Sequence, residues 1–340
     1  LHQPTTSPAP QPTISSSLLA VENLTVEFRT RSGVVKALEF VNFAIQPGET
    51  VGIVGESGSG KSVTAFTLMG VLDRAGKVTA GRALLQTDSV AVDLLKEPES
   101  SLRQIRGKEV SMIFQNPRTA LNPIRKVGKQ ITDVLRCHTD LLQSDLCSKA
   151  LELLASVRIP DPEKRYDAYP YELSGGLCQR IMIALALACS PKLLIADEPT
   201  TGLDVTTQAT VMNLIKDLAD QRQMASMLIT HDLALASEYC DRIVVMHAGH
   251  VVESAPTHTL FTHPRHPYTA KLIAATPEPH KSFADLTPIP GSLPDLKAAD
   301  LPPCRFSGRC DRYEAGLCDQ TPLAREFMDA EHQVACWKPL

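Results

Sequence analysis

The amino-acid sequence predicts an α/β fold in which helices cover both faces of a largely parallel sheet. Short apolar segments recur along the chain between stretches whose apolar residues have helical spacing, and this alternation is typical of parallel β–α–β units. A second pattern precedes them, because residues 18–45 alternate apolar and polar side chains around a turn at residues 29–33, which predicts β-strands joined by that turn. The buried-strand candidates are residues 51–54, 110–114, 192–196, 225–229 and 243–246.

Two regions depart from this alternation. Residues 116–172 carry apolar residues at helical spacing with charges between them, which predicts a helical subdomain inserted into the sheet domain. After about His258 the chain is rich in proline, histidine and cysteine, which disfavours long helices and central strands. We expect an appended region there that does not continue the sheet. Further predictions are helices at about residues 61–72 and 177–189 and a hairpin turn at residues 248–249.

Composition excludes several classes of protein. The formal net charge is −4 and hydrophobic residues make up 43% of the chain, so no basic excess indicates nucleic acid as a partner. The longest apolar stretch, residues 181–188, is too short to cross a bilayer. Residues 1–17 are rich in proline, serine and threonine and have no features of a signal peptide, so we expect a disordered leader.

The first motif with a chemical meaning follows the strand candidate at residues 51–54. Its spacing fits G-x-x-x-x-G-K-[ST], with a strand before it and a helix after it, as in phosphate-binding loops. Glycines let successive backbone N–H groups point at one phosphate, and the helix adds its positive N-terminal end. We expect the lysine to reach the β- and γ-phosphates of ATP and the last serine to ligate Mg²⁺. The loop residues are Gly55, Glu56, Ser57, Gly58, Ser59, Gly60, Lys61 and Ser62.

A pair of carboxylates ends the strand candidate at residues 192–196. An apolar strand ending in Asp-Glu is common and usually structural, but here a phosphate loop is already placed. In such enzymes the strand-end Asp holds Mg²⁺, directly or through water, and a neighbouring carboxylate can polarise the attacking water. We therefore expect Asp197 to hold Mg²⁺ and Glu198 to act as the general base.

A second candidate anion site lies at Leu173-Ser174-Gly175-Gly176-Leu177. The serine hydroxyl, the N–H groups of two glycines and the start of an apolar helix can together hold a phosphate. The alternative is a simple helix cap at Ser174, which any helix can have.

This segment resembles the signature of ABC-transporter ATPases, LSGGQ, with Leu177 in place of the glutamine. The other elements of that family follow in its order along the chain. The resemblance implies a P-loop NTPase of the ABC-ATPase fold, with a RecA-like core, an antiparallel β-subdomain, a helical subdomain and a Cys-rich C-terminal appendage. It further implies that the signature of one subunit completes the nucleotide site of another. ATP between two subunits can then satisfy the anion sites at Lys61 and Ser174, and dimerisation becomes part of the mechanism. It also implies catalytic roles for Gln115, Glu198 and His231, Mg²⁺ at Ser62, Gln115 and Asp197, and nucleotide contacts from Phe28, Ser174, Gly175, Gly176 and Asp204. Read alone, Phe28 is nearly as well explained as a core residue of a strand, and a strand-end histidine such as His231 is usually structural.

The tail narrows the resemblance. His266-Pro267-Tyr268-Thr269, the Pro-Gly-x-x-Pro pattern from Pro290 and the cysteine cluster resemble the ATPases of oligopeptide, dipeptide and nickel importers. This implies import of peptides, with nickel chelates or glutathione as alternative passengers. It implies a second ATPase subunit that is a distinct paralogue, two membrane permeases and an extracytoplasmic solute-binding protein. The chain is then peripheral, at the cytoplasmic face of the inner membrane.

Four of the nine cysteines, Cys304, Cys310, Cys318 and Cys336, lie in the last 37 residues, and the sequence carries no secretion signal. Four thiolates can hold Zn²⁺ or a [4Fe–4S] cluster, or the thiols can stay free or form disulfides. The spacing is wider than in zinc knuckles. The resemblance to the importer ATPases implies the iron–sulfur cluster, as a cross-link for a tail with little core.

Three regions follow from these patterns: a leader at residues 1–17, a nucleotide-binding domain at 18–257 and an extension at 258–340. Two other classes of function compete with the transport ATPase. A soluble ABC ATPase acting on ribosomes or DNA usually has two cassettes or a long coiled coil, whereas this chain has one phosphate loop and no sustained heptads. A P-loop kinase or switch would need neither the Ser174 motif nor His231.

Overall fold

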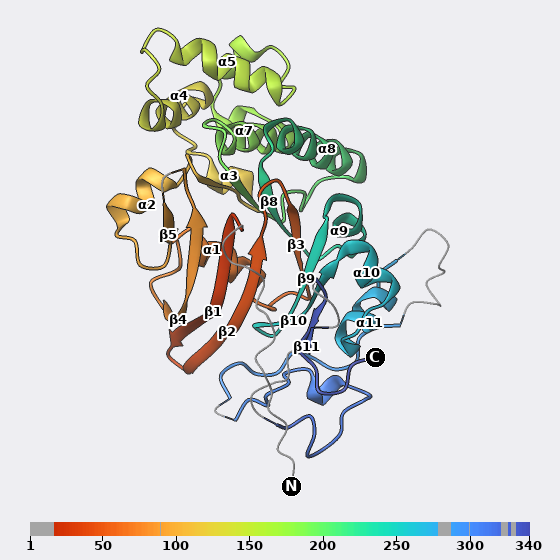
Figure 1. The fold of residues 1–340 in the computed structure, drawn as a ribbon. Coiled ribbons are helices and arrows are strands. Elements are labelled where there is room, and N and C mark those ends of the chain that lie inside the picture. Colours follow the sequence, from red (N-terminus) through yellow and green to blue (C-terminus); the bar gives the residue numbers. More distant parts are fainter. Residues whose placement is uncertain (1–16, 89, 278–286, 299, 321–325, 328–330) are drawn as a thin grey trace.

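The computed structural model describes residues 17–88, 90–277, 287–298, 300–320, 326–327 and 331–340. The predicted leader therefore lies almost entirely outside the described residues. Two sheets form the body of the molecule, and a group of helices stands beyond them (Figure 1). Among the described residues, no helix combines the length and the apolarity that a bilayer crossing needs.

The smaller sheet has four antiparallel strands in the order β2-β1-β4-β5. The two long strands predicted from the alternating pattern are present and pair along most of their length. The third and fourth strands follow the phosphate-loop helix and were not predicted, because their exposed residues hide the alternation. The strands are β1 (Leu19–Thr30), β2 (Gly33–Ile45), β4 (Gly76–Gln86) and β5 (Ala91–Asp93).

The larger sheet has eight strands in the order β11-β12-β10-β9-β3-β8-β7-β6, and its central strands run parallel, as predicted. Strand β3 lies between β9 and β8, so the loop after β3 opens at the middle of the sheet. The strands are β3 (Thr50–Val54), β6 (Val110–Ile113), β7 (Leu193–Asp197), β8 (Ala225–Thr230), β9 (Arg242–His247), β10 (His250–Pro256), β11 (Glu326–Phe327) and β12 (Gln333–Val334).

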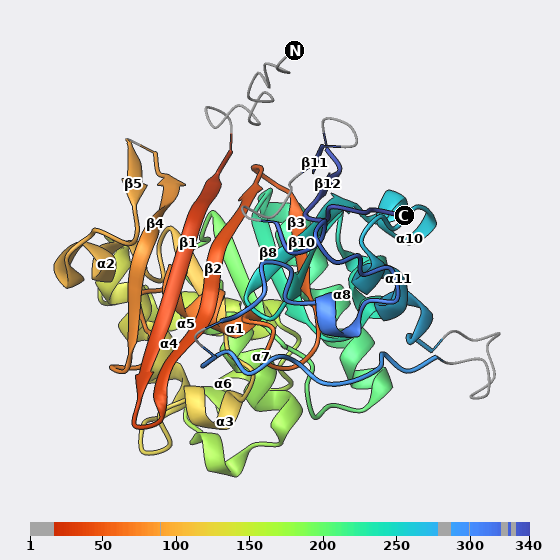
Figure 2. The same cartoon turned by 90° about the horizontal axis from the view of Figure 1, so that it is seen from below.

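Alternate residues of the central strands enter two different hydrophobic cores. In β7, Leu193 and Ile195 pack in one core with the small sheet and with helix α1 (Lys61–Leu68). Leu194 and Ala196 pack in the other core with α7 (Gly175–Ala186), α8 (Val205–Arg222) and α9 (Leu233–Tyr239). One face of the large sheet is therefore covered by the antiparallel sheet as well as by helices, which differs from the prediction of helices alone. Figure 2 shows the small sheet as a separate layer.

The predicted helical subdomain is a compact group of short helices at one end of the molecule (Figure 1). Its core is formed by buried apolar residues of α4, α5 and α7, among them Ile131, Leu154 and Ile181. The predicted helix at residues 61–72 ends earlier, at Leu68, because Gly70 adopts a positive φ of 62°. The helices are α1 (Lys61–Leu68), α2 (Glu99–Ile105), α3 (Pro117–Ala120), α4 (Val127–His138), α5 (Leu146–Ser156), α6 (Pro162–Tyr166), η2 (Pro170–Glu172), α7 (Gly175–Ala186), α8 (Val205–Arg222), α9 (Leu233–Tyr239), α10 (Thr257–Thr262), α11 (Pro267–Ala274) and η4 (Ser307–Arg309).

The prediction that the C-terminal region does not continue the sheet is wrong. Strand β12 pairs antiparallel with β10, and β11 pairs with β12, so the tail extends the large sheet at its edge. An edge strand leaves backbone donors and acceptors unpaired, and two short strands of the tail satisfy part of that edge. The buried carboxylate of Glu253 in β10 secures the junction by accepting hydrogen bonds from the N–H groups of Arg265 and His266, and it also pairs with His332.

Candidate active site

The loop between β3 and α1 has the backbone that a phosphate cradle requires. Gly55, Gly58 and Gly60 have φ angles of 149°, 80° and 103°, a region that side chains disfavour. A Cβ atom on Gly55 would lie 2.1 Å from the carbonyl oxygen of Met246 in the neighbouring strand β9. Glycine at this position is therefore required by packing as well as by φ, and the loop can curl tightly above the sheet.

Lys61 begins α1 and points back into the loop. Its side chain is buried, and its ammonium group donates hydrogen bonds to the carbonyl oxygens of Gly55 at 2.7 Å and Glu56 at 3.0 Å. Burial lowers the pKa of Lys61, while the carboxylates of Glu198 and Asp197 oppose that shift. The lysine is thus a charged group held inside the loop, where a phosphate would meet it.

Ser62 and Asp197 form the second contact of the site. The Ser62 hydroxyl donates to Oδ1 of Asp197 at 3.0 Å, which joins the start of α1 to the end of β7. Burial raises the pKa of the Asp197 carboxyl, and the hydrogen bond from Ser62 opposes this rise. A hydroxyl and a carboxylate oxygen side by side are donors that Mg²⁺ accepts, so the pair fits the predicted metal-binding role.

Glu198 is the centre of a four-residue network. Its Oε2 accepts hydrogen bonds from the amide of Gln115 at 2.8 Å and the hydroxyl of Thr201 at 2.9 Å, and its Oε1 lies 3.1 Å from Nδ1 of His231. Burial works to raise the pKa of Glu198, but the hydrogen bonds from His231 and Thr201 outweigh it and the net shift is downward. The carboxylate is therefore ionised at neutral pH, as a general base must be.

The backbone of Glu198 is strained. Its φ is 46°, in the left-handed region that a non-glycine residue seldom adopts. Such strain persists where the surroundings hold the residue in place, and it is concentrated at functional sites. Here the residue follows β7 directly, and its carboxylate meets Gln115 after β6 and His231 after β8, the two strands that flank β7 in the sheet.

Other predicted site residues lie apart from this network. Ser174 is the N-cap of α7 and accepts from the N–H of Leu177 at 3.3 Å, while Asp204 caps α8 through two hydrogen bonds from Thr207. Both therefore perform the structural capping role that was the alternative reading of Ser174. A Cβ atom on Gly175 would meet open space, so this turn is uncovered. The ring of Phe28 in β1 lies against Gly76 and is partly buried at the border of the core beside the small sheet, so part of the ring stays exposed.

Three residues of the site escaped the sequence interpretation. Thr201, which hydrogen-bonds Glu198, stands three residues after it and has no motif of its own. Tyr268 and Arg309 contact Glu56 of the phosphate loop from 212 and 253 residues further along the chain. For Tyr268 the sequence signal is the stretch His266-Pro267-Tyr268-Thr269, which indicates the subfamily and does not indicate a contact with the phosphate loop.

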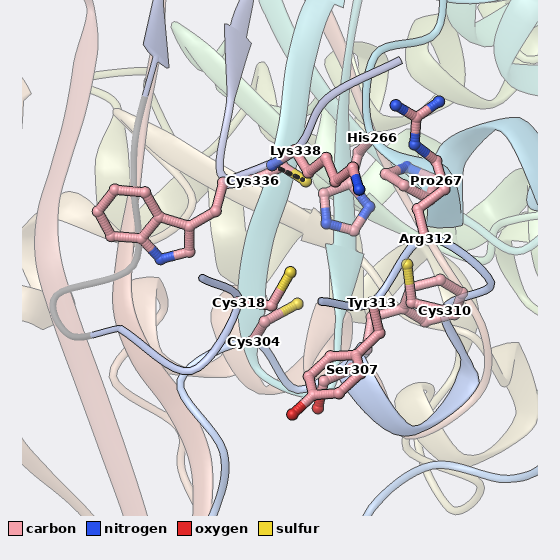
Figure 3. A pocket seen from close by; sticks show the side chains of 12 residues that line it. His266, Pro267, Cys304, Ser307, Cys310, Arg312, Tyr313, Cys318, Cys336 and Lys338 are labelled. Atoms are coloured by element: carbon pink, nitrogen blue, oxygen red, sulfur yellow. Dashed lines mark hydrogen bonds between the residues drawn. The ribbon is translucent and has the colours of Figure 1, made fainter. Parts of the chain in front are cut away.

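The four tail cysteines line one small pocket together with His266, Phe306 and Trp337 (Figure 3). Within the described part of the chain, no three histidine, cysteine or acidic side chains are arranged closely enough to hold a metal ion. Burial raises the pKa of Cys304 to about 11 and also raises that of Cys310 and Cys336. The iron–sulfur cluster is therefore not supported by this geometry and stays a prediction.

Comparison with known proteins identifies the family. Residues 38–201 match the family model "ABC transporter", and residues 252–318 match "Oligopeptide/dipeptide transporter, C-terminal region". The chain is 42% identical over 337 residues to the oligopeptide transport ATP-binding protein OppD of Salmonella typhimurium, covering 99% of this chain and 97% of OppD. It is an ABC transporter ATPase. The dipeptide transport ATP-binding protein DppD of Escherichia coli is 43% identical to this ATPase and covers 95% of it, with 97% of DppD matched.

Solved structures agree with this assignment. The ATP-binding cassette MJ0796, solved as a dimer bound to ADP and phosphate, is 27% identical to this ABC ATPase, with a TM-score of 0.62. The match covers 98% of that cassette but 70% of this chain. The ABC ATPase fold predicted from the phosphate loop and the Ser174 motif is thus confirmed. As an ABC ATPase, the protein uses ATP and Mg²⁺.

Proposed function

We propose that this chain hydrolyses ATP to energise the import of di- and oligopeptides through a membrane ABC transporter. The observation that carries the proposal is the Glu198 network. Hydrogen bonds from His231 and Thr201 keep the Glu198 carboxylate ionised beside the Ser62–Asp197 pair, and such a carboxylate is suited to activate water. Matches to oligopeptide and dipeptide transport proteins along almost the whole chain support peptides as the passenger.

The residues divide the chemical work. Lys61 and the N–H groups of the loop bind the phosphates of ATP, and Glu198 takes a proton from the attacking water. His231 orients the Glu198 carboxylate and approaches the γ-phosphate, and Phe28 stacks on the adenine. Ser62, Gln115 and Asp197 would hold Mg²⁺, which neutralises charge on the phosphates when bound.

A second ATPase subunit completes the site. Its Ser174, Gly175 and Gly176 turn would close over the triphosphate held by Lys61 of this chain, and Asp204 would line the same interface. The exposed Ser174, the open space at Gly175 and the 82% exposure of Val205 beside Asp204 support this proposal. ATP then holds the two subunits together and hydrolysis releases them. We propose that the partner is a distinct paralogue.

The rest of the assembly follows from this role. Two permeases would span the membrane and dock helices beside Gln115 and the helical subdomain at about residues 116–172, and an extracytoplasmic binding protein would deliver the peptide. The chain would lie at the cytoplasmic face of the inner membrane and bind no nucleic acid. We propose residues 18–257 as the nucleotide-binding domain and 258–340 as the transporter-specific extension.

The test is reconstitution of the ATPase with the permeases that co-purify with it. ATP turnover by the assembly in lipid vesicles is measured with the binding protein loaded with dipeptides, longer peptides, a nickel chelate or glutathione. Stimulation by peptides supports the proposal, and stimulation by nickel chelate or glutathione alone replaces the passenger. Co-purification with ribosomes or DNA and no permease would overturn the transport role.

We also propose that the extension, as a Cys-rich appendage, binds a [4Fe–4S] cluster through Cys304, Cys310, Cys318 and Cys336. The donor set fits the cluster in number and chemistry, since four thiols line one pocket, although their sulfur atoms must move closer together. The cluster would cross-link a segment with little core and would displace the thiol protons. Iron and acid-labile sulfide near four per chain in anaerobically purified protein supports it. Zinc, or no metal, in a chain with four reactive thiols would refute it.

A further inference from the structure

An arginine of the C-terminal extension grips the phosphate loop. The guanidinium of Arg309 donates two parallel hydrogen bonds to the carboxylate of Glu56, at 2.8 and 2.9 Å, across 253 residues of sequence. Its third nitrogen, Nε, donates to the carbonyl of Pro290 at 2.7 Å, which fixes the plane of the guanidinium. The Arg309 side chain is 5% exposed and that of Glu56 is 30% exposed. Charge-assisted hydrogen bonds of this bidentate kind are stronger than neutral ones and also fix the relative orientation of the two side chains.

The backbone of Glu56 is held at two further points. Its N–H donates to the hydroxyl of Tyr268 at 3.0 Å, and its carbonyl accepts from the ammonium of Lys61 at 3.0 Å. Glu56 is therefore tied to the extension by its carboxylate and by its N–H, and to the phosphate-binding lysine by its carbonyl. A shift of Glu56 would move one of the groups that hold the Lys61 ammonium.

A cluster of buried aromatic rings packs against the Arg309 side chain. The rings of Tyr268, His247 and Phe306 pack together with centroids 4.5 to 5.3 Å apart, and the Arg309 guanidinium carbon lies 5.7 Å from the Phe306 ring centre. Burial lowers the pKa of His247 to about 4, so this histidine is neutral and adds no charge beside Glu56. A Cβ atom on Gly58 would lie 3.3 Å from the side chain of Leu293, so the extension borders the loop at a second place.

From this geometry we infer that Arg309 is a positioning residue of the nucleotide site, which holds the phosphate loop and Lys61 in their ATP-binding shape by acting through Glu56. The inference rests on the proposed function, since it gives the extension a part in the same site. It requires no contact between Arg309 and ATP. An ABC cassette without this extension must hold its loop by other means.

A double-mutant cycle on the full-length protein tests the inference. Arg309→Met keeps the packing on Phe306 and removes the ion pair, and Glu56→Ala removes the other partner. We expect each single variant to raise the KM for ATP by roughly five- to thirtyfold, the usual loss for one partner of a charged hydrogen-bonded pair that is partly exposed, with kcat within about threefold. The double variant is expected to match the weaker-binding single variant, because the two side chains act as one unit. Arg309→Lys, which keeps the charge without the bidentate fork, is expected to recover part of the affinity.

Controls separate this inference from others. Lys271→Gln breaks the exposed ion pair of α11 with Asp311, two residues beyond Arg309, without touching the loop, and it should leave the KM unchanged. An unchanged KM in Arg309→Met, or additive effects in the cycle, would overturn the inference. If Arg309→Met does not fold, as judged by its thermal unfolding, Glu56→Ala alone decides by the same criterion. A separate variant tests the proposed ATP site itself. If Lys61→Ala retained ATP binding, the proposed site would be wrong, whatever the result for Arg309.

Discussion

Glu198 is the residue whose replacement tests the catalytic site most directly. Glu198→Gln keeps the size of the side chain and removes the charge and the basicity, so the contacts that pack against it are retained. In the native side chain, Oε2 accepts hydrogen bonds from Gln115 at 2.8 Å and Thr201 at 2.9 Å, and Oε1 lies 3.1 Å from Nδ1 of His231. Because the hydrogen bonds from His231 and Thr201 lower the pKa of Glu198, the carboxylate is available as a base throughout the neutral range.

The magnitude follows from that role. A positioned general base contributes roughly 10²- to 10⁴-fold to a rate, which corresponds to about 2.7 to 5.4 kcal/mol of activation free energy. The side chain is 17% exposed, so little water can replace the lost base, and we expect the fall in kcat to lie in the upper part of that range. The KM for ATP should change by less than about threefold, because Glu198 contacts neither Lys61 nor the loop glycines through the hydrogen bonds described.

Phosphate release by the purified assembly measures kcat, and a fluorescent nucleotide measures ATP affinity in the same samples. Glu152→Gln, an exposed carboxylate on α5 paired only with Lys149 among the described contacts, serves as the matched control and should be indistinguishable from the unmodified protein. ATP is expected to accumulate unhydrolysed on the Glu198→Gln assembly. Turnover within threefold of the unmodified protein would refute the assignment of the base.

Further predictions concern stability and the second subunit. The hydrogen bond with His250 lowers the pKa of Glu39 to about 2, so this carboxylate stabilises the fold fully above pH 4.5 and loses the contribution as the pH falls through 2. Urea unfolding should show Glu39→Gln less stable by roughly 1–2 kcal/mol at pH 6.5, after discounting for solvent exposure, and by about a quarter of that difference at pH 2.5. Gly128→Ala places a Cβ atom 2.1 Å from the Tyr166 ring and should destabilise the helical subdomain by roughly 1–3 kcal/mol in urea unfolding. An unchanged urea midpoint would show that the ring can move aside without cost. Ser174→Ala removes only a helix cap from its own subunit. ATP binding by the isolated chain should therefore be retained, while ATP turnover by the assembly should fall. Turnover equal to that of the unmodified assembly would show that Ser174 is not part of the shared site.

Local patterns were sufficient for much of the fold. The five short apolar segments predicted as buried strands correspond to β3, β6, β7, β8 and β9. Short apolar segments that alternate with helices are typically buried as the strands of a parallel sheet. The phosphate loop could also be predicted from the sequence, because its glycines specify the local backbone conformation. Strands β4 and β5 were missed because most of β4 is exposed and carries no clean alternation.

The tail shows the limit of such patterns. Proline-rich composition disfavours long helices after α11, and in the described residues beyond it the helical structure is the three-residue η4. The same composition gave no sign of the two-residue strand β12 that pairs with β10. Pairing of so short a segment depends on an open sheet edge that another part of the chain supplies. The cysteine cluster in the sequence likewise predicts which four thiols lie together, and all four line one pocket. It does not predict the distances between their sulfur atoms.

The sequence alone determined which residues carry the chemistry, namely the glycine loop with Lys61 and the Asp197–Glu198 pair at a strand end. It also determined the subfamily, through the motifs of the C-terminal tail. Only the tertiary structure decided that Gln115 and His231 meet at Glu198, because the order of strands β6, β7 and β8 in the sheet brings together loops that are 33 to 83 residues apart. The same holds for Arg309 and Glu56. Contacts of this kind depend on the path of the chain through the whole fold, and a local pattern carries no record of that path.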